Sequence, residues 1–480
     1  MCGPSPGPGP VFNAGIFFMS KARLLLASER RAIVGLAGLY ATRMLGLFMV
    51  LPVLALNADH LAGATPLLVG LALGVYGLTQ AVLQIPFGLL SDRLGRKPVI
   101  AAGLGLFAIG SVIAAQADSI AMMIVGRSLQ GSGAVAAAIM ALLADQTREQ
   151  VRTAAMATIG LSIGVAFGVA MVLGPLVASR FGLAGVFYFT ALLALLGLVV
   201  LWKLVPPAPR RRGHRDVGLD RGQLASILGR LDLWRMDASI FSLHLILMAI
   251  FTAVPFRLVD AGIVEAHHGL VYLLVMGLSF VAMVPLVIVA EKKRKMKLMC
   301  LGAIATITLS LLGLGLAGTG LAALCAWLLA FFTAFNLLEA TLPSMISKLA
   351  PAGAKGTAMG VYSTSQFLGA FLGGVLGGFL AQQFGLSAVF LGAALLGLGW
   401  FLLMLGMRAP RHLSSEVVAL AEGVERDTLD SLMARFAAVA GVEDVLVVPE
   451  ERLAYLKVDR TRLDTEALER LTRTSRQSTP

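Results

Sequence analysis

The sequence predicts an all-α membrane protein of twelve transmembrane helices in two six-helix halves, followed by a small α+β domain. Three observations predict this: the hydrophobic composition, twelve apolar stretches of spanning length, and basic residues that gather in alternate loops. Of the 480 residues, 58% are hydrophobic and 14% are charged, with a mean hydropathy of +0.85. A soluble domain usually carries about 25% charged residues. The composition therefore excludes a soluble protein and makes the lipid bilayer its first partner.

About 20 consecutive apolar residues cross a bilayer as a helix. Stretches of this kind lie near 32–56, 66–90, 98–116, 119–144, 154–178 and 184–205, and again near 236–258, 269–290, 298–317, 320–347, 357–380 and 386–408. The longest polar loop falls between the two sets. The predicted organisation is an N-terminal tail (1–31), helices 1–6 (32–205), a central loop (206–235), helices 7–12 (236–408) and a C-terminal domain (409–480).

Lys and Arg in short loops are retained on the cytoplasmic side of a membrane. Basic residues gather in the loops at 93–97, 148–152, 210–215, 292–297 and 348–355, while Arg180 lies in the opposite set. Both termini are therefore predicted to be cytoplasmic. Topology also accounts for the net charge of +12, so no nucleic-acid partner is expected. Residues 1–18 are predicted to be a Pro/Gly-rich tail, and Met19 is an equally suitable start.

Three motifs resemble those of a known family of transporters. The segment from Gly88 to Ile100 resembles the loop between helices two and three of the major facilitator superfamily. On helix four, the Arg-x-x-Gln-Gly-x-Gly-Ala pattern of that family is matched by Arg127, Gln130, Gly131, Gly133 and Ala134. On helix five, the motif of the drug/proton antiporter branch is partly matched by Gly164, Gly168, Gly174 and Pro175, with Ala178 and Ser179 where paired glycines are expected.

Longer segments at 43–52, 336–343 and 355–369 are similar to YajR-type transporters, which carry a similar C-terminal domain. The resemblance implies an inner-membrane, multi-pass secondary transporter with the proton gradient as its energy source and no cofactor. Efflux of a small hydrophobic or cationic compound by alternating access is the expected function. Proton-coupled uptake and a transporter-like receptor that signals through its C-terminal domain are the alternatives.

The sequence lacks the common motifs of enzymes and metal sites. The sequence has no His-Glu-x-x-His, no Gly-x-Ser-x-Gly and no paired intramembrane aspartates, so an enzyme is not expected. The three cysteines, Cys2, Cys300 and Cys325, have no Cys-x-x-Cys spacing, so neither a disulfide framework nor a metal site is expected.

The helix 2–3 loop has a role that the resemblance implies. In the family, the residue matching Asp92 caps helix eleven, and the residue matching Arg96 pairs with an acid at the end of helix four, here Asp145. A helix N-terminus stabilises an anion, so the first contact is physically reasonable. The two contacts would form a conformational latch between the halves. Its predicted members are Gly88, Asp92, Arg93, Gly95, Arg96, Lys97 and Asp145. The alternative is that the basic residues of the loop only enforce topology.

Few charged residues lie within the apolar stretches, and such residues usually face the protein interior or a water-filled cavity. Glu339 is the only carboxylate well inside a span, so it is the first candidate for a proton-binding site. His244 is the second, because imidazole titrates near neutral pH. Asp237, at the start of helix seven, and Arg127 complete the coupling candidates. A static ion pair for Glu339 and a hydrogen-bonded core histidine for His244 remain the alternatives.

Other polar and small residues recur at helical spacing. Tyr76, Gln80 and Gln84 fall on one face of helix two, and lining of a cavity and hydrogen bonding between helices are both open. Arg43 and Asn336 join them as candidates for the substrate path. Glycines recur at every fourth position at 160–168 and 369–377, which allows close helix approach, for sliding contacts or for tight packing.

Beyond residue 409, charged residues return and the apolar runs shorten. A strand at 415–421, a helix at 426–440, strands at 442–448 and 453–458, and a helix at 465–471 are predicted. This βαββα order is the ferredoxin-like plan without a clear final strand. The domain could bind a ligand, self-associate or contact the cytoplasmic loops, and the sequence does not choose among these roles.

Overall fold

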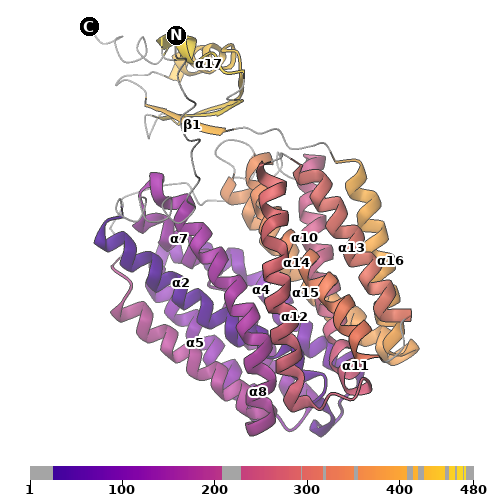
Figure 1. Ribbon diagram of the computed structural model, residues 1–480. Helices are drawn as coiled ribbons and strands as arrows, with labels where there is room; N and C mark the ends of the chain where they lie inside the picture. The colour runs from indigo at the N-terminus through magenta and orange to yellow at the C-terminus, as the bar shows by residue number, and fades with distance from the viewer. Residues whose placement is uncertain are drawn as a thin grey trace, which may run out of the picture.

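The computed structural model describes residues 25–207, 229–292, 295–316, 320–350, 355–407, 414–419, 426–448, 453–459, 462–468 and 470–471. Within this part of the chain, eleven helices are long and apolar enough to cross a membrane. Figure 1 shows them packed side by side in one bundle. The predicted all-α membrane architecture is thus confirmed. The Pro/Gly-rich tail, the alternative start at Met19 and most of the central loop lie outside the described residues.

The first half begins with one long helix and alternates in direction from helix to helix. Its elements are α2 (Ala27–Phe48), α3 (Leu51–Leu54), the short 3-10 turn η1 (Ala58–His60), α4 (Pro66–Leu94), α5 (Arg96–Ala115), α6 (Ile120–Ser132), α7 (Ala136–Gln146) and α8 (Glu149–Lys203). Thr65 caps α4 by accepting a hydrogen bond from the Leu68 amide, with Pro66 at the first helical position. Helix α2 starts at Ala27, so the predicted tail boundary at residue 31 was too late.

Helix α8 accounts for the difference between eleven observed and twelve predicted spans. It contains 55 residues. A straight helix of that length would extend for about 80 Å, more than twice the thickness of the hydrocarbon core. Gly182 interrupts it with φ 65° and ψ −173°, a backbone conformation that glycine adopts without strain. The two predicted spans at 154–178 and 184–205 lie on either side of this glycine.

The second half has the same general order. Its elements are α10 (Leu231–Phe251), α11 (Val254–Asp260), α12 (Glu265–Lys292), α13 (Met296–Leu316), α14 (Leu321–Leu349), α15 (Lys355–Phe384) and α16 (Leu386–Leu405). Three spans that were predicted to be continuous, 32–56, 119–144 and 236–258, are each broken into two helices. Pro52 and Pro255 stand at the start of α3 and α11, where proline starts a new helix because it lacks an N–H to continue the old one.

The two halves pack closely at one end of the bundle, here called the Pro66 end. Gly70 and Gly74 of α4 lie so close to the backbone of α15, at Gly374 and Phe371, that a Cβ atom would not fit there. The Leu67 amide also donates to Gln382 Oε1 at 3.1 Å. On another face of α15, the predicted glycine stripe at 369–377 packs directly against the backbone of α10. Close helix approach is therefore confirmed for α15.

At the opposite end, here called the Asp92 end, the same helix face meets open space. Gly356 and Gly360 lie about five helical turns before Gly374 and Gly378, on the same side of α15. A Cβ atom at either of them would have no neighbour within 4 Å among the described residues. A Cβ atom at Gly160 of α8 would likewise have no neighbour within 4 Å in the part of the chain that the structure describes. The described halves are therefore joined at the Pro66 end and apart at these Asp92-end positions.

The predicted glycine face of helix five needs a correction. Gly160 has open space, and Gly164 and Gly168 meet only the ring of Phe280 from α12. A ring that covers two glycines keeps the backbones apart, so this face does not provide the predicted close helix approach. Gly174, just before Pro175, does touch backbone, at Met49.

The C-terminal segment forms a three-stranded antiparallel sheet in the order β1-β3-β2. Its elements are β1 (Ser414–Ala419), α17 (Arg426–Ala437), β2 (Val442–Val448) and β3 (Leu453–Val458). Residues 465–468, 470 and 471 are helical. Phe436 and Leu456 are enclosed in its core. The element order follows the prediction, and the ferredoxin-like assignment stays a prediction.

Candidate functional site

The two leading titratable residues of the sequence lie in contact. Glu339 of α14 places Oε1 3.1 Å from Nε2 of His244 on α10. The side chain of His244 is 11% exposed, whereas that of Glu339 is 33% exposed. Glu339 therefore offers one oxygen to the histidine and keeps part of its carboxylate accessible, although it lies in the middle of a spanning helix.

The hydrogen bonds around His244 restrict where a proton can sit. Nδ1 lies 3.3 Å from the Ile240 carbonyl, which can only accept, so Nδ1 must donate. A neutral ring then presents a lone pair at Nε2, which the side-chain amide of Gln366 approaches at 2.8 Å. An ionised Glu339 would face that same lone pair. One added proton, on the carboxylate or on Nε2, turns this repulsive approach into a hydrogen bond. The arrangement can thus hold and release a single shared proton.

Asp237 lies near this pair but does not join it. It stands two turns before His244 on α10, and its Oδ1 is buried without a hydrogen-bond partner among the described residues. The hydroxyl of Tyr362 on α15 is likewise buried without a hydrogen-bond partner among the described residues. Asn336 turns elsewhere: its amide donates to Ser279 Oγ of α12 at 2.9 Å. Asn336 therefore ties two helices together instead of extending the Glu339 site.

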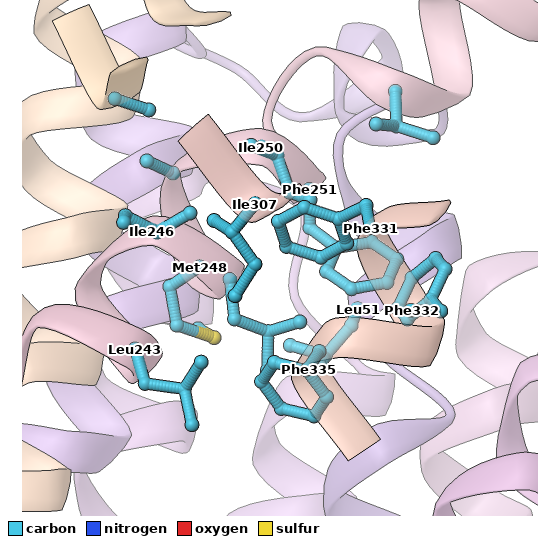
Figure 2. Close-up of a cluster of buried hydrophobic side chains, with 14 of the residues drawn as sticks. Leu51, Leu243, Ile246, Met248, Ile250, Phe251, Ile307, Phe331, Phe332 and Phe335 are labelled. Atoms are coloured by element: carbon cyan, nitrogen blue, oxygen red, sulfur yellow. The ribbon is translucent and has the colours of Figure 1, made fainter. Parts of the chain in front are cut away.

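An aromatic cluster borders the site toward the Pro66 end. We define it as Phe48, Phe167, Phe332 and Phe335. The Phe335 ring lies 6.1 Å from that of His244 and 6.0 Å from that of Phe167 on α8, and Phe167 lies 4.9 Å from Phe48 on α2. Figure 2 shows Phe332 and Phe335 beside Phe331 and Phe251, with Leu51 of the first half next to them. The cluster joins the two halves, so it closes the space between them at this depth.

In the first half, the polar stripe of helix two is a set of hydrogen-bond partners. Nη2 of Arg43 donates to Tyr76 Oη at 2.9 Å, to Gln80 Oε1 at 2.6 Å and to the Gly133 carbonyl at 3.2 Å. Gln84 follows through a bond of 3.5 Å from Gln80. Hydrogen bonding between helices is thus observed for Tyr76 and Gln80, and lining of a cavity stays a prediction.

Arg127 belongs to a second network in the same half. Its Nη1 donates to Gln130 Oε1 at 2.8 Å, and its Nε donates to the Ala72 carbonyl at 3.2 Å. Gln130 in turn donates to Ser111 Oγ at 2.7 Å. These partners are all on helices of the first half, so the motif on helix four holds that half together. A coupling role for Arg127 stays a prediction.

The helix 2–3 loop shows the predicted ion pair. Gly95 has φ 96° and separates α4 from α5, which explains the glycine at this position. Arg96 Nε lies 3.2 Å from Asp145 Oδ2, and Arg96 Nη1 lies 2.6 Å from Asp92 Oδ1. The pairing of Arg96 with Asp145 is confirmed.

The remaining loop residues have different surroundings. Arg93 is exposed, while Lys97 donates to the Val205 carbonyl at 2.5 Å and so fastens α5 to the end of α8. The Gly88 carbonyl accepts from Ser91 Oγ. The contact between Asp92 and the start of helix eleven stays a prediction; in the described part of the chain, the ion-pair partner of Asp92 is Arg96.

Sequence reasoning missed Gln366 and the aromatic cluster. Gln366 ends a polar run that begins at Tyr362 within a predicted span, and that run was an available signal. The four phenylalanines carry no comparable signal, because most phenylalanines in spanning helices face lipid or core.

Comparison with known proteins supports the membrane-transport reading of this geometry. A family model described as Major Facilitator Superfamily matches residues 36–374 and 343–449. The chain belongs to the major facilitator superfamily. The inner membrane transport protein YajR of Escherichia coli (strain K12) is 46% identical over 431 residues, which are 90% of this chain and 94% of that protein. The predicted YajR-type resemblance is confirmed.

Two more distant proteins are also similar to the chain. The multidrug resistance protein MdtL of Salmonella heidelberg (strain SL476) is 28% identical over 249 residues, 50% of this chain and 63% of that protein. A crystal structure of a D-xylose-proton symporter superposes with a TM-score of 0.64 at 17% identity, covering 80% of this chain and 98% of that one. At that identity the match shows a shared fold.

Proposed function

We propose that the protein is a proton-coupled secondary transporter that exports a small hydrophobic compound across the inner membrane by alternating access. The observation that carries the proposal is the contact of Glu339 with His244, beside the aromatic cluster and on its Asp92-end side. A carboxylate that shares one proton with a histidine can load and release that proton at neutral pH. The phenyl rings of the aromatic cluster provide an apolar surface for the apolar part of the substrate.

The proposed topology has twelve spans, with the two arms of α8 counted separately. The Asp92 end is cytoplasmic on this proposal, because the basic loops gather there. The structure then corresponds to a form that is open toward the cytoplasm. Rocking of the halves would separate Phe167 from Phe332 and Phe335, and so open the path on the other side.

The loop network would control which form is populated. On this proposal, the Asp92 carboxylate meets the N-terminus of α15 only when the cytoplasmic side closes, and Arg96 and Asp145 hold the carboxylate in position. The latch therefore favours the outward-facing form without touching substrate.

The test is flux in proteoliposomes under an imposed pH gradient, measured with a panel of neutral, cationic and anionic hydrophobic dyes. Glu339→Gln keeps the shape of the side chain but cannot exchange a proton, so gradient-driven flux should fall to that of empty vesicles while dye binding remains. Glu265→Gln, at the Pro66 end beside Asn57, is the matched control and should keep wild-type flux. Unchanged flux in Glu339→Gln would remove this residue from the mechanism. Substrate flux in the same direction as the proton flux, instead of the opposite direction, would indicate uptake.

A further inference from the structure

Two positive charges are enclosed in the first half around a single phenol. Arg43 is 1% exposed and Arg127 is 0% exposed. Arg43 donates to the Tyr76 hydroxyl, and the Arg127 guanidinium lies 5.2 Å from the centre of the Tyr76 ring. Among the described residues, neither arginine has a carboxylate within ion-pair distance. Enclosed charges of one sign without a counter-ion are strongly unfavourable, so this arrangement calls for an anion.

The two arginines differ in how completely they are bonded. Arg127 donates from all three of its nitrogens, to Gln130 and to the carbonyls of Ala72 and Leu73. Arg43 uses only Nη2, whereas its Nε and Nη1 are buried without a hydrogen-bond partner. Arg127 is therefore a structural residue, and Arg43 retains donors for a ligand.

The backbone near Arg43 also favours the binding of an anion. Arg43 contacts the Gly133 carbonyl in the break between α6 and α7. Helix α7 starts three residues later at Ala136, and its N-cap residue Val135 provides no side-chain cap. Uncapped amides at a helix N-terminus favour an anion, and broken helices in transporters present such ends to charged groups of the substrate.

Arg43 stands at a depth that matches the proton site in the other half. It lies five residues before Phe48 on α2, about 7.5 Å of helix rise toward the Asp92 end. Glu339 lies four residues after Phe335 on α14, about 6 Å in the same direction. Both residues therefore adjoin the aromatic cluster from the same side.

We propose that Arg43 binds the anionic group of the transported compound, and that the substrate is an organic carboxylate with an apolar body. This inference rests on the proposed transport function, because the bound carboxylate is a substrate only if the protein transports it. Carboxylate oxygens match guanidinium donors better than any neutral acceptor. Because Arg43 is enclosed here, the carboxylate enters as the flexible side chain of Gln80 gives up its bond. The assignment replaces the cationic substrate that sparse buried charge had suggested.

The test is thermal unfolding of the purified full-length protein in detergent with benzoate and with benzamide. The two probes share a ring and differ in charge, and sodium chloride at equal ionic strength controls for salt. Benzoate should raise the unfolding midpoint at a half-saturating concentration at least about tenfold below that of benzamide. Arg43→Gln should respond equally to both probes. Arg257→Gln, which removes a guanidinium bonded to Ser387 at the other end, should keep the preference.

Several results would overturn the assignment. An equal response of the wild type to benzoate and benzamide would exclude a carboxylate site, and an equal effect of chloride would mean a site for inorganic anions only. A benzoate preference that survives in Arg43→Gln would place the site elsewhere. If Arg43→Gln does not fold, Arg43→Lys should fold and show a reduced preference, and an unreduced one would count against Arg43. Because this measurement needs no transport, a benzoate preference without proton-driven flux would reject the proposed function and leave the anion site intact.

Discussion

The two halves of the bundle differ in the charged candidate residues that they enclose. The first half buries Arg43 and Arg127, and the second buries Asp237 and His244 and carries Glu339 on its inner wall. A guanidinium keeps its proton at every physiological pH, whereas a carboxylate and an imidazole exchange theirs. On the proposed function, Glu339 and His244 of the second half couple transport to protons, and Arg43 of the first half supplies a permanent positive charge for the substrate.

The Arg127 network of the first half and the side chains of Asp237 and Tyr362 in the second half differ in how their polar groups are satisfied. Arg127, Gln130 and Ser111 form a continuous hydrogen-bonded chain in the first half. In the second half, Asp237 Oδ1 and the hydroxyl of Tyr362 are buried without partners among the described residues. A saturated network resists change, and an unsaturated one accommodates a proton that comes and goes. Mutations should therefore affect stability in the first half and pH dependence in the second.

The largest expected effect is on stability, from Arg127→Leu. The substitution leaves Gln130 Oε1 and two carbonyl oxygens buried without a donor, and should lower the free energy of unfolding by about 3 kcal/mol or more. Thermal unfolding of the purified protein measures this. Glu339→Gln is the comparison in the other half and should change the free energy of unfolding by about 1 kcal/mol or less. Similar losses in both variants would contradict the division between the halves.

A smaller effect is expected from His244→Gln. Glutamine can accept a hydrogen bond from Gln366 but cannot take up the shared proton, so Glu339 must load and release it alone. Proton-driven flux should fall about tenfold, which corresponds to about 1.4 kcal/mol in the activation free energy of transport. The dependence of the flux on pH should also change. Flux measured across the neutral pH range gives both quantities. A profile identical to that of the wild type would make His244 a packing residue.

The smallest effect is expected at the latch, in Asp92→Asn. A charge–dipole contact is worth about 0.3–1 kcal/mol when exposed and up to about 2 kcal/mol when partly buried. Its loss should move the population severalfold toward the form open at the Asp92 end. A Gly360→Cys reporter, in a background without the three native cysteines, should then react faster with a maleimide. Arg93→Gln, which alters an exposed charge in the same loop, should leave the rate unchanged. Equal maleimide reaction rates for the reporter protein, its Asp92→Asn variant and its Arg93→Gln variant would mean that the loop only fixes membrane topology.

Residues that lie close in sequence carried most of the successful predictions. The length of apolar runs is a local property, and it predicted the spanning helices of both halves and the separate C-terminal sheet. The ion pair of Arg96 with Asp145, which are 49 residues apart, was instead implied by the resemblance of the motif around Asp92 to the family. The predicted spans did not show the breaks at Pro52 and Pro255 within them, because hydropathy does not register a missing N–H.

By itself, the sequence determined the membrane environment, the order of the helices and the few residues able to carry charge in lipid, since each follows from composition or spacing within one segment. Tertiary structure alone decided that Glu339 meets His244, that Asn336 turns to Ser279, and that Phe167 reaches Phe335 across the halves. The physical reason is that the sequence of one helix does not fix how far that helix is rotated about its own axis. Periodicity shows which residues share a face, but the packing of small residues against neighbouring backbones decides where each face points. The glycines of α15 set that rotation, and with it the partners of Gln366 and His244.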